Sequence, residues 1–158
     1  MNNSFRELKK SKPKIRKNVF QIVNGLWCGD INTAMDYTYL NNKSISCLIN
    51  CCENPKLINN KNMYYPPSIK YRVCKDLYND LDWIVDYVEN SILNDENVLV
   101  FCDTGIQRSP TIILAYLIKY GKLDIRTCQM FMKSKNENIF ISNIKYIDLI
   151  YSFEKIYK

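Results

Sequence analysis

The residues from Val98 to Pro110 carry the side chains that could do chemistry, in the order VLVFCDTGIQRSP. An apolar run, typical of a buried strand, ends at Cys102, and five residues then separate this cysteine from Arg108. Ser109 and Pro110 follow and indicate the first turn of a helix. A loop between a strand and a helix N-terminus turns several backbone N–H groups toward one point, where the helix dipole adds positive potential. The segment therefore predicts an anion-binding loop that begins with a cysteine.

The side chains of this loop match one kind of reaction. Cys102 would be held as a thiolate, the nucleophilic form of the side chain, and Arg108 can bind two oxygens of a phosphate with its planar guanidinium. A thiolate beside such an oxyanion cradle can attack phosphorus. The spacing of cysteine and arginine alone is a weak signal, but the apolar strand, Gly105 at the turn, Ser109 and the following helix strengthen it. The competing interpretation is a buried structural cysteine beside an arginine that caps a helix.

The same loop supplies the candidate substrate-binding residues. We expect the backbone N–H groups of the loop to bind the phosphate oxygens. These residues are Asp103, Thr104, Gly105, Ile106, Gln107 and Arg108. The side chains of Asp103 and Thr104 are expected at the rim of the pocket. The reaction needs no metal ion and no cofactor.

Composition narrows the class of protein. The chain has 158 residues, 47% of them hydrophobic, which fits one globular domain with a substantial core. No apolar run approaches the roughly 20 residues of a membrane span. Seven cysteines, an odd number, with Cys51 next to Cys52, indicate reduced thiols and hence a cytoplasmic protein, with entry into the nucleus left open. The sequence has no histidine and no Cys-x2-Cys pair, which argues against a structural zinc site.

Charge divides the chain into a basic N-terminal tail, residues 1–19, and a catalytic domain, residues 20–158. The net charge is +6. Much of it comes from Lys9, Lys10, Lys12, Lys14, Arg16 and Lys17. Such a tail can make weak contacts with nucleic acid or an anionic surface. The competing interpretation is a disordered, solubilising segment, and the polar start of the chain does not resemble a secretory signal. No feature of the sequence sets an oligomeric state.

Strand and helix patterns alternate along the domain. Strands are expected over residues 20–23, 26–28, 46–50, 69–73 and 98–101, with a turn at 24–25 and a loop over 56–68. Helices are expected over 33–41 capped by Asn32, 76–93, 109–120 stopped by Gly121, 124–132, and from Ser142-Asn143 to near Tyr157. This order predicts an α/β fold, a single three-layer domain with a central mixed, twisted sheet flanked by helices. Residues 98–101 form the most apolar strand, which delivers Cys102 to the end of the sheet where such folds bind ligands.

Several segments resemble one known family. They are Leu26-Trp27-Cys28-Gly29, the helix Ile113–Lys119 after the loop, and Ser142-Asn143-Ile144-Lys145-Tyr146. Together with the loop, they make the chain similar to the compact dual-specificity phosphatases of the cysteine-based protein tyrosine phosphatase superfamily, over roughly residues 20–156. The resemblance implies a protein tyrosine phosphatase-like fold. It also implies hydrolysis of phosphotyrosine and phosphoserine/phosphothreonine in phosphorylated proteins, through a phosphocysteine intermediate.

The chain departs from the family at the residue before the cysteine. The family has histidine there, which helps to hold the loop and keep the thiol acidic, whereas this chain has Phe101. Lipid phosphatases of the superfamily tend to carry lysines in the loop, and their absence here favours phosphoproteins over phosphoinositides. The missing histidine supports an alternative, a pseudophosphatase that binds phosphoproteins without turnover. The basic tail supports another, an RNA 5′-triphosphatase.

The general acid of the family is an aspartate in the loop after the strand at residues 69–73. At the family's usual separation from the cysteine this chain has Tyr71, inside that strand, so the candidates are Asp76, Asp80 and Asp82. We favour Asp76 because it directly follows the strand. The competing interpretation is that Asp76 caps the next helix, and Asp80 and Asp82 would then be exposed residues of its first turn.

A second cysteine is expected near the loop. Cys52 lies just past the strand 46–50, whose end runs close to the catalytic loop in the fold that the resemblance implies. It could trap an oxidised Cys102 as a disulfide. The competing interpretation, a small buried residue, is the one we favour.

Overall fold

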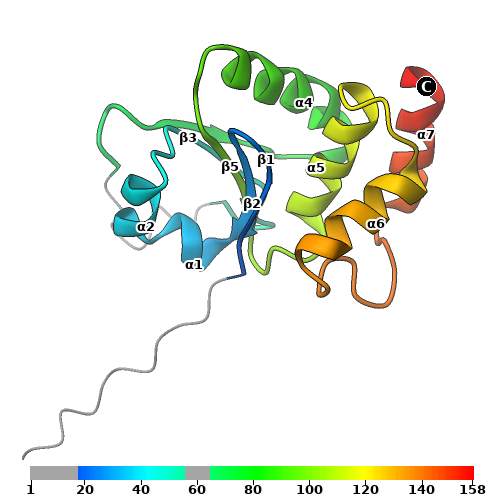
Figure 1. The fold of residues 1–158 in the computed structure, drawn as a ribbon, viewed down its shortest axis with the longest axis horizontal. Coiled ribbons are helices and arrows are strands. Elements are labelled where there is room, and N and C mark those ends of the chain that lie inside the picture. Colours follow the sequence, from blue (N-terminus) through cyan, green and yellow to red (C-terminus); the bar gives the residue numbers. More distant parts are fainter. Residues whose placement is uncertain (1–17, 56–64) are drawn as a thin grey trace, which may run out of the picture.

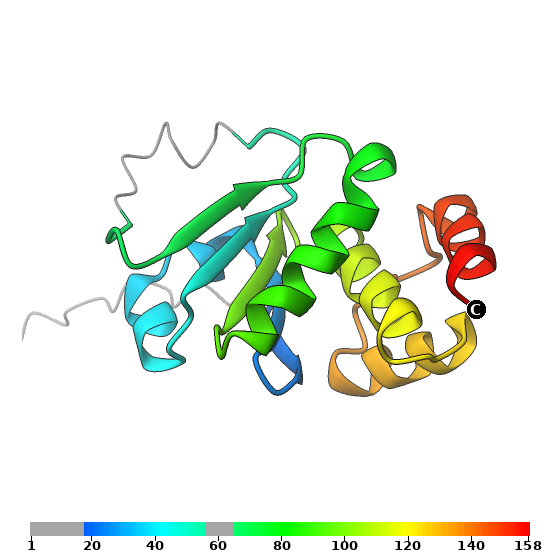
Figure 2. The ribbon, with the colours of Figure 1, turned by 90° about the horizontal axis from the view of Figure 1, so that it is seen from above.

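The computed structural model describes residues 18–55 and 65–158. This part of the chain forms a five-stranded sheet with helices on both of its faces (Figures 1 and 2). The strands are β1 (Phe20–Val23), β2 (Leu26–Asp30), β3 (Cys47–Asn50), β4 (Lys70–Val73) and β5 (Val98–Cys102). The helices are α1 (Ile31–Ala34), α2 (Tyr37–Asn42), α4 (Leu77–Leu93), α5 (Arg108–Lys119), α6 (Ile125–Lys135) and α7 (Ile147–Tyr157).

The sheet has the strand order β1-β2-β5-β3-β4. β1 is antiparallel to β2 and the other pairs are parallel, so the predicted mixed sheet is confirmed. In the register, Asp30 of β2 lies beside Cys102 of β5, and Asn50 of β3 lies between Phe101 of β5 and Val73 of β4. Four strands therefore end at one edge of the sheet, and Cys102 is at the centre of that edge.

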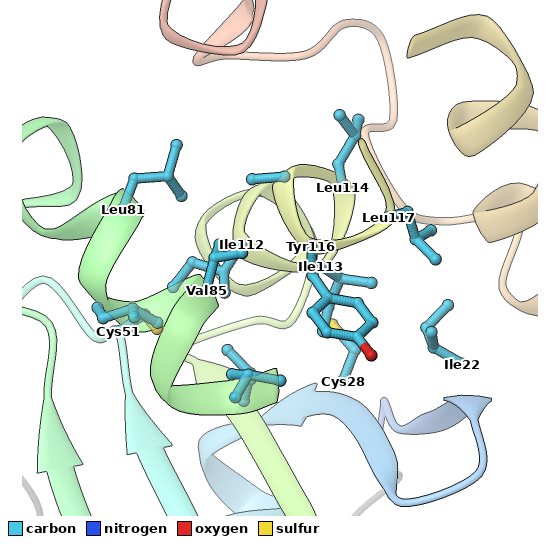
Figure 3. Packing of buried hydrophobic residues seen from close by; sticks show 14 of the residues in the cluster. Ile22, Cys28, Cys51, Leu81, Val85, Ile112, Ile113, Leu114, Tyr116 and Leu117 are labelled. Atoms are coloured by element: carbon cyan, nitrogen blue, oxygen red, sulfur yellow. The ribbon is translucent and has the colours of Figure 1, made fainter. Parts of the chain in front are cut away.

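Two apolar layers cover the sheet, which confirms the predicted three-layer domain. The larger layer lies between the sheet and α4–α7, and Figure 3 shows Val85 of α4, Ile112 of α5 and Cys28 of β2 in it. The smaller layer lies under α1 and α2. Alternation along β5 sends Cys102 to the larger layer and Phe101 to the smaller one. The two neighbours therefore lie on opposite faces of the sheet.

Helix α5 runs through the middle of the larger layer. All of its residues from Ser109 to Ile118 are buried, as expected for a helix that is apolar on every side. It begins at Arg108, one residue before the predicted start, and its C-cap is Tyr120. The helix ends before Gly121 as predicted, and position 121 requires glycine because a Cβ there would lie 2.5 Å from the carbonyl oxygen of Leu117. The N-terminus of α5 consequently faces the loop that follows Cys102.

The single helix predicted over residues 33–41 with Asn32 as its cap is wrong. The structure has two short helices, α1 and α2, instead. Asp30 caps the first by accepting the N–H of Thr33 at 2.9 Å, and Asp36 caps the second by accepting the N–H of Tyr39 at 3.0 Å. The second carboxylate starts a new helix where the sequence pattern indicated a continuous one.

The predicted start of the last helix at Ser142-Asn143 is also wrong. Helix α7 begins at Ile147, and its N-cap Tyr146 makes no side-chain capping bond. Ser142 has φ +75°, a left-handed conformation that a helix cannot continue, and the carbonyl of Asn143 accepts a hydrogen bond from Gln107. Residues 142–146 are therefore a loop that packs against the anion-binding loop.

The remaining elements agree with prediction to within one to three residues at their ends. The basic tail up to residue 17, and residues 56–64 of the predicted loop 56–68, lie outside the described residues. Over the described ranges no helix combines the length and apolar character needed to cross a membrane.

Candidate active site

Cys102 is surrounded by hydrogen-bond donors at the end of β5. Its side chain is 2% exposed. The N–H of Gly105 donates to Cys102 Sγ at 3.2 Å, and the Ser109 hydroxyl lies 3.2 Å from the same sulfur. The N-terminus of α5 adds positive potential on this side. The sulfur therefore lies among donors at the N-terminal end of α5.

The turn of the loop depends on Gly105. This residue has φ +72°, which L side chains rarely adopt. A Cβ on it would lie 3.0 Å from the backbone carbon and oxygen of Gly29 in β2. The glycine therefore lets the loop curl over Cys102 and pack against the neighbouring strand at the same time.

Ser109 lies at the centre of a small buried network. Its hydroxyl is 3.2 Å from the carbonyl oxygen of Gly29 and 3.2 Å from Cys102 Sγ, and the thiol of Cys28 donates to it at 3.5 Å. Burial is the main cause that raises the pKa of Cys28, so this thiol keeps its proton. Ser109 thus receives one hydrogen bond from Cys28 and has its own proton to donate.

Arg108 is held by two neutral acceptors. Its Nε donates to the carbonyl oxygen of Cys51 at 2.6 Å, and its Nη1 donates to the hydroxyl of Tyr146 at 3.0 Å. Burial acts to lower the pKa of Arg108, but the Tyr146 hydroxyl and the neighbouring thiols outweigh it and the net shift is upward. The guanidinium is therefore charged and its plane is fixed.

The first side chains of the loop lie at its rim. Asp103 accepts the N–H of Glu53 at 3.1 Å, and Thr104 is exposed. The carbonyl of Thr104 accepts a hydrogen bond from Asn18 at 2.9 Å, and the side chain of Asn136 donates to Asn18 in turn. The start of the described chain is therefore tied both to the loop and to the end of α6.

The later loop residues bind the segment before α7. The carbonyl of Ile106 accepts the N–H of Phe140 at 2.9 Å. The side chain of Gln107 donates to the carbonyl of Asn143 at 2.9 Å and accepts the N–H of Lys145 at 3.0 Å. The Gln107 side chain is thus engaged with this segment, and any contribution of Gln107 to phosphate binding comes from its backbone.

Tyr146 and Asn18 are the site neighbours that sequence reasoning missed. Tyr146 stands in the segment that carried the family resemblance, and this was the only signal for it. Asn18 was assigned to the tail. Neither lies near the loop in sequence, so spacing could not connect them to Cys102.

Asp76 is the N-cap of α4. Its carboxylate accepts the N–H of Tyr78 at 2.9 Å and the side-chain amide of Asn79 at 2.7 Å, so its capping role is confirmed. Asp80 accepts the N–H groups of Lys75 and Asp76 in return. Burial acts to raise the pKa of Asp80, but these hydrogen bonds reverse the shift and lower it. A carboxylate stabilised in this way is a poor proton donor.

Asp82 lies far from the loop. It forms an ion pair with Lys119 at 2.8 Å and accepts the hydroxyl of Tyr157. Because a helix rises about 1.5 Å per residue, Lys119 is roughly 16 Å along α5 from Arg108. The hydrogen bond from Lys119 is the main cause that lowers the pKa of Asp82. Asp80 and Asp82 are thus held by contacts that lower their pKa values, and the role of Asp76 as the general acid stays a prediction.

Cys52 is buried just after β3. Burial first, and then the charge of Asp103, raise the pKa of Cys52 to about 12. All seven cysteines lie within the described residues and are free thiols. A thiol that keeps its proton is a weak nucleophile, which favours the packing role of Cys52, and its redox role stays a prediction. Across residues 18–55 and 65–158, no group of three or more His, Cys, Asp or Glu side chains could hold a metal ion.

The family of the chain follows from comparison with known sequences. The family model "Dual specificity phosphatase, catalytic domain" matches residues 26–156. The chain therefore belongs to this family of cysteine-based phosphatases, as the resemblance of the loop and of segments on both sides of it predicted.

Related proteins differ in how much of their length the chain covers. A putative tyrosine phosphatase 123R of Invertebrate iridescent virus 6 is 28% identical over 139 residues, which are 85% of this chain and 91% of that protein. Human dual specificity protein phosphatase 16 is 29% identical over 106 residues, 67% of this chain but only 16% of that protein.

Solved structures show the same fold. The human tyrosine phosphatase-like serine/threonine/tyrosine-interacting protein superposes with a TM-score of 0.78 over 90% of this chain and 99% of its own, at 19% identity. Human DUSP28 gives a TM-score of 0.73 over 87% of this chain and 93% of its own, at 15% identity.

Replacing Phe101 by the histidine of the family tests whether Phe101 limits the reactivity of Cys102. Phe101 is fully buried among Trp27, Leu40 and Leu99, so a histidine there would act on the loop from the opposite face to the thiol. Phe101→His is expected to raise the fraction of Cys102 present as thiolate and the turnover near neutral pH. It is also expected to cost about 1–3 kcal/mol of stability, because a polar ring enters an apolar layer.

Alkylation rates measured across pH, together with melting temperatures, check this prediction. Phe101→Leu is the control, because it disturbs the same packing without adding a donor. An alkylation profile of Phe101→His that equals that of Phe101→Leu would show that Phe101 does not limit the site.

Proposed function

We propose that this protein is a protein phosphatase that hydrolyses phosphotyrosine and phosphoserine/phosphothreonine through a phosphocysteine intermediate. The observation that carries the proposal is the position of Cys102 Sγ, 3.2 Å from both the N–H of Gly105 and the hydroxyl of Ser109. The charged guanidinium of Arg108 belongs to the same loop. This arrangement matches a nucleophile placed under a cradle for three phosphate oxygens.

In the first step the Cys102 thiolate attacks phosphorus in line with the leaving oxygen. The sulfur–phosphorus bond forms as the phosphorus–oxygen bond to the substrate breaks. The loop N–H groups and Arg108 bind the other three oxygens and offset their charge. Asp76 gives its proton to the leaving oxygen, which departs as a neutral alcohol or phenol.

In the second step a water molecule attacks the phosphocysteine. The Asp76 carboxylate accepts a proton from this water, the sulfur–phosphorus bond breaks, and inorganic phosphate is released. Cys102 leaves as a thiolate, and the Ser109 hydroxyl stabilises it by donating a hydrogen bond. Every atom that reacts comes from the substrate, from water or from these side chains.

Space beside the loop supports a polypeptide substrate. A hollow of about 460 Å³ opens next to it, lined by Asn18, Thr104, Ile106, Lys135 and Ile141 among others. Such a hollow has room for residues that flank a phosphorylated side chain. Localisation in the cytoplasm, and weak contact of the basic tail with anionic partners, are part of the same proposal.

A rapid-quench experiment with a phosphotyrosine peptide tests the proposal. With a peptide that carries ³²P in its phosphotyrosine, we expect covalent label on Cys102 during turnover, and release of labelled inorganic phosphate. Binding of the peptide without any release of phosphate would contradict the proposal and support a pseudophosphatase. Release of the γ-phosphate from triphosphate-ended RNA in preference to peptides would support an RNA 5′-triphosphatase.

Asp76→Asn separates the two roles of Asp76. Asparagine caps a helix as well as aspartate does, so the melting temperature should hardly change. Hydrolysis of phosphotyrosine should slow about 10²-fold, whereas hydrolysis of an activated aryl phosphate should slow far less, because only a poor leaving group needs a proton. Steady-state kinetics on the two substrates measure this difference.

The control for this variant is Asp80→Asn, which changes a carboxylate in the same helix turn. It should lose stability without distinguishing between the two substrates. An equal loss on both substrates in Asp76→Asn would reduce Asp76 to a helix cap.

A further inference from the structure

The guanidinium of Arg108 has to be both charged and correctly oriented before a phosphate arrives. Arginine has five N–H donors in one plane, and it binds a phosphate well only when this plane faces the anion. An arginine on a loop would normally lose much rotational freedom on binding. Contacts that fix the side chain beforehand reduce that loss.

Neutral oxygens fix the plane of Arg108. Nε donates to the carbonyl of Cys51, which follows β3, and Nη1 donates to the hydroxyl of Tyr146, just before α7. No carboxylate of the described residues pairs with Arg108, so its charge is not cancelled by an ion pair. An ion pair would orient the guanidinium equally well but would compete with the phosphate for its charge.

Tyr146 is itself fixed in position. Its side chain is 8% exposed, and its ring packs edge-on against Tyr78 with the ring centroids 6.0 Å apart. The Cζ of Arg108 lies 5.9 Å from the Tyr146 ring centroid, so ring and hydroxyl both contact the arginine. The hydroxyl oxygen of Tyr146 is the acceptor of the hydrogen bond from Arg108.

Gln107 connects Tyr146 to the loop. Its side-chain amide binds the segment before Tyr146 twice, through the carbonyl of Asn143 and the N–H of Lys145. Gln107 immediately precedes Arg108 in the chain. The Gln107 side chain thus binds the segment that carries Tyr146, and Tyr146 in turn binds Arg108.

We propose that Tyr146 is a positioning residue for Arg108, and that the Gln107 side chain keeps Tyr146 in place. The contacts lead from Gln107 through the segment of Tyr146 back to the neighbouring Arg108. They orient the guanidinium for a tetrahedral oxyanion before the anion binds. This inference rests on the proposed function for its meaning in catalysis. Its effect on anion binding does not depend on turnover.

Tyr146→Phe tests the inference because it removes one oxygen atom and keeps the packed ring. We expect kcat/KM on an aryl phosphate to fall about tenfold, the size of one hydrogen bond to a charged group. The affinity for inorganic phosphate, measured by calorimetry, should fall by a similar factor, and the melting temperature should stay within about 2 °C. Tyr78→Phe is the matched control, because it removes a hydroxyl from the adjoining ring. It should change neither kcat/KM nor the affinity for phosphate.

A double-mutant cycle tests whether Gln107 and Tyr146 act together on Arg108. Gln107→Met removes both amide hydrogen bonds at similar volume and should weaken phosphate binding several-fold. If both residues act through the orientation of Arg108, the double variant should lose no more than the weaker-binding single variant. Multiplied effects in the double variant, or a Tyr146→Phe protein within twofold of the parent in phosphate affinity, would overturn the inference.

The calorimetric arm separates this inference from the proposed function. A parent protein that binds phosphate but releases none from substrates would refute the proposed function alone. In that case the phosphate affinities of the same variants still decide whether Tyr146 positions Arg108.

Discussion

Cys102→Ser is expected to abolish phosphatase turnover while leaving the binding of phosphate esters intact. Serine is uncharged at neutral pH and is a weak nucleophile, so the rate should fall by more than about 10⁴-fold, as it does when other enzymes lose a nucleophile. The donors that bind the phosphate survive, because Gly105 and Arg108 are unchanged. Initial rates on an aryl phosphate and calorimetry with a phosphotyrosine peptide measure the two properties separately.

Cys128→Ser is the control for this experiment. Cys128 is a buried cysteine of α6, and replacing it changes packing without touching the loop. It should lower the melting temperature and leave turnover per folded molecule unchanged. If Cys102→Ser retained more than a few per cent of the parent turnover, the nucleophile would have to be another residue.

Arg108→Lys is expected to reduce kcat/KM by about 10³-fold, the upper range for loss of one oxyanion-binding group. Lysine keeps the positive charge but has no planar fork. It cannot contact the carbonyl of Cys51, the hydroxyl of Tyr146 and two phosphate oxygens together. The loss should appear on phosphotyrosine and phosphothreonine peptides alike, because both present the same phosphate to the loop.

Kinetics on both peptides check this second prediction. Arg126→Lys on the exposed surface of α6 is the control and should behave like the parent. Near-parent activity of Arg108→Lys would mean that the guanidinium does not bind two phosphate oxygens. The phosphate would then be bound by backbone N–H groups alone.

The central part of the fold could be predicted because its signals are local and strong. The apolar run of β5, the proline at the start of α5 and Gly121 at its end each act within a few residues. The α1 and α2 region could not be predicted in the same way. Three polar residues, Asp30, Asn32 and Asp36, compete there to cap a helix, and the pairing of Asp30 with Cys102 across the sheet extends β2 as far as the cap.

The residues of the candidate site likewise fall into those that local sequence signals predict and those that they do not. Cys102, Arg108 and Ser109 belong to one continuous segment, so their spacing together with the flanking strand and helix patterns connected them. Tyr146 and Asn18 reach the loop from distant parts of the chain, through tertiary contacts that no periodicity reports. The contacts of the three candidate aspartates could not be predicted either, because backbone N–H groups that bind Asp80 and the Lys119 side chain that binds Asp82 come from the tertiary structure.

Ser109 has a single hydroxyl proton and two acceptors at equal distance, the carbonyl of Gly29 and the sulfur of Cys102, each at 3.2 Å. The thiol of Cys28 donates to the same oxygen, so that side of the hydroxyl is already occupied. In the proposed mechanism the Ser109 proton turns toward the sulfur when the sulfur is a thiolate, the stronger acceptor, and returns to the carbonyl when the sulfur carries a phosphoryl group. The direction of the Ser109 O–H bond would therefore differ between the two halves of the proposed catalytic cycle. The help that Ser109 gives to the departing sulfur equals the difference between these two hydrogen bonds, and not the full strength of either.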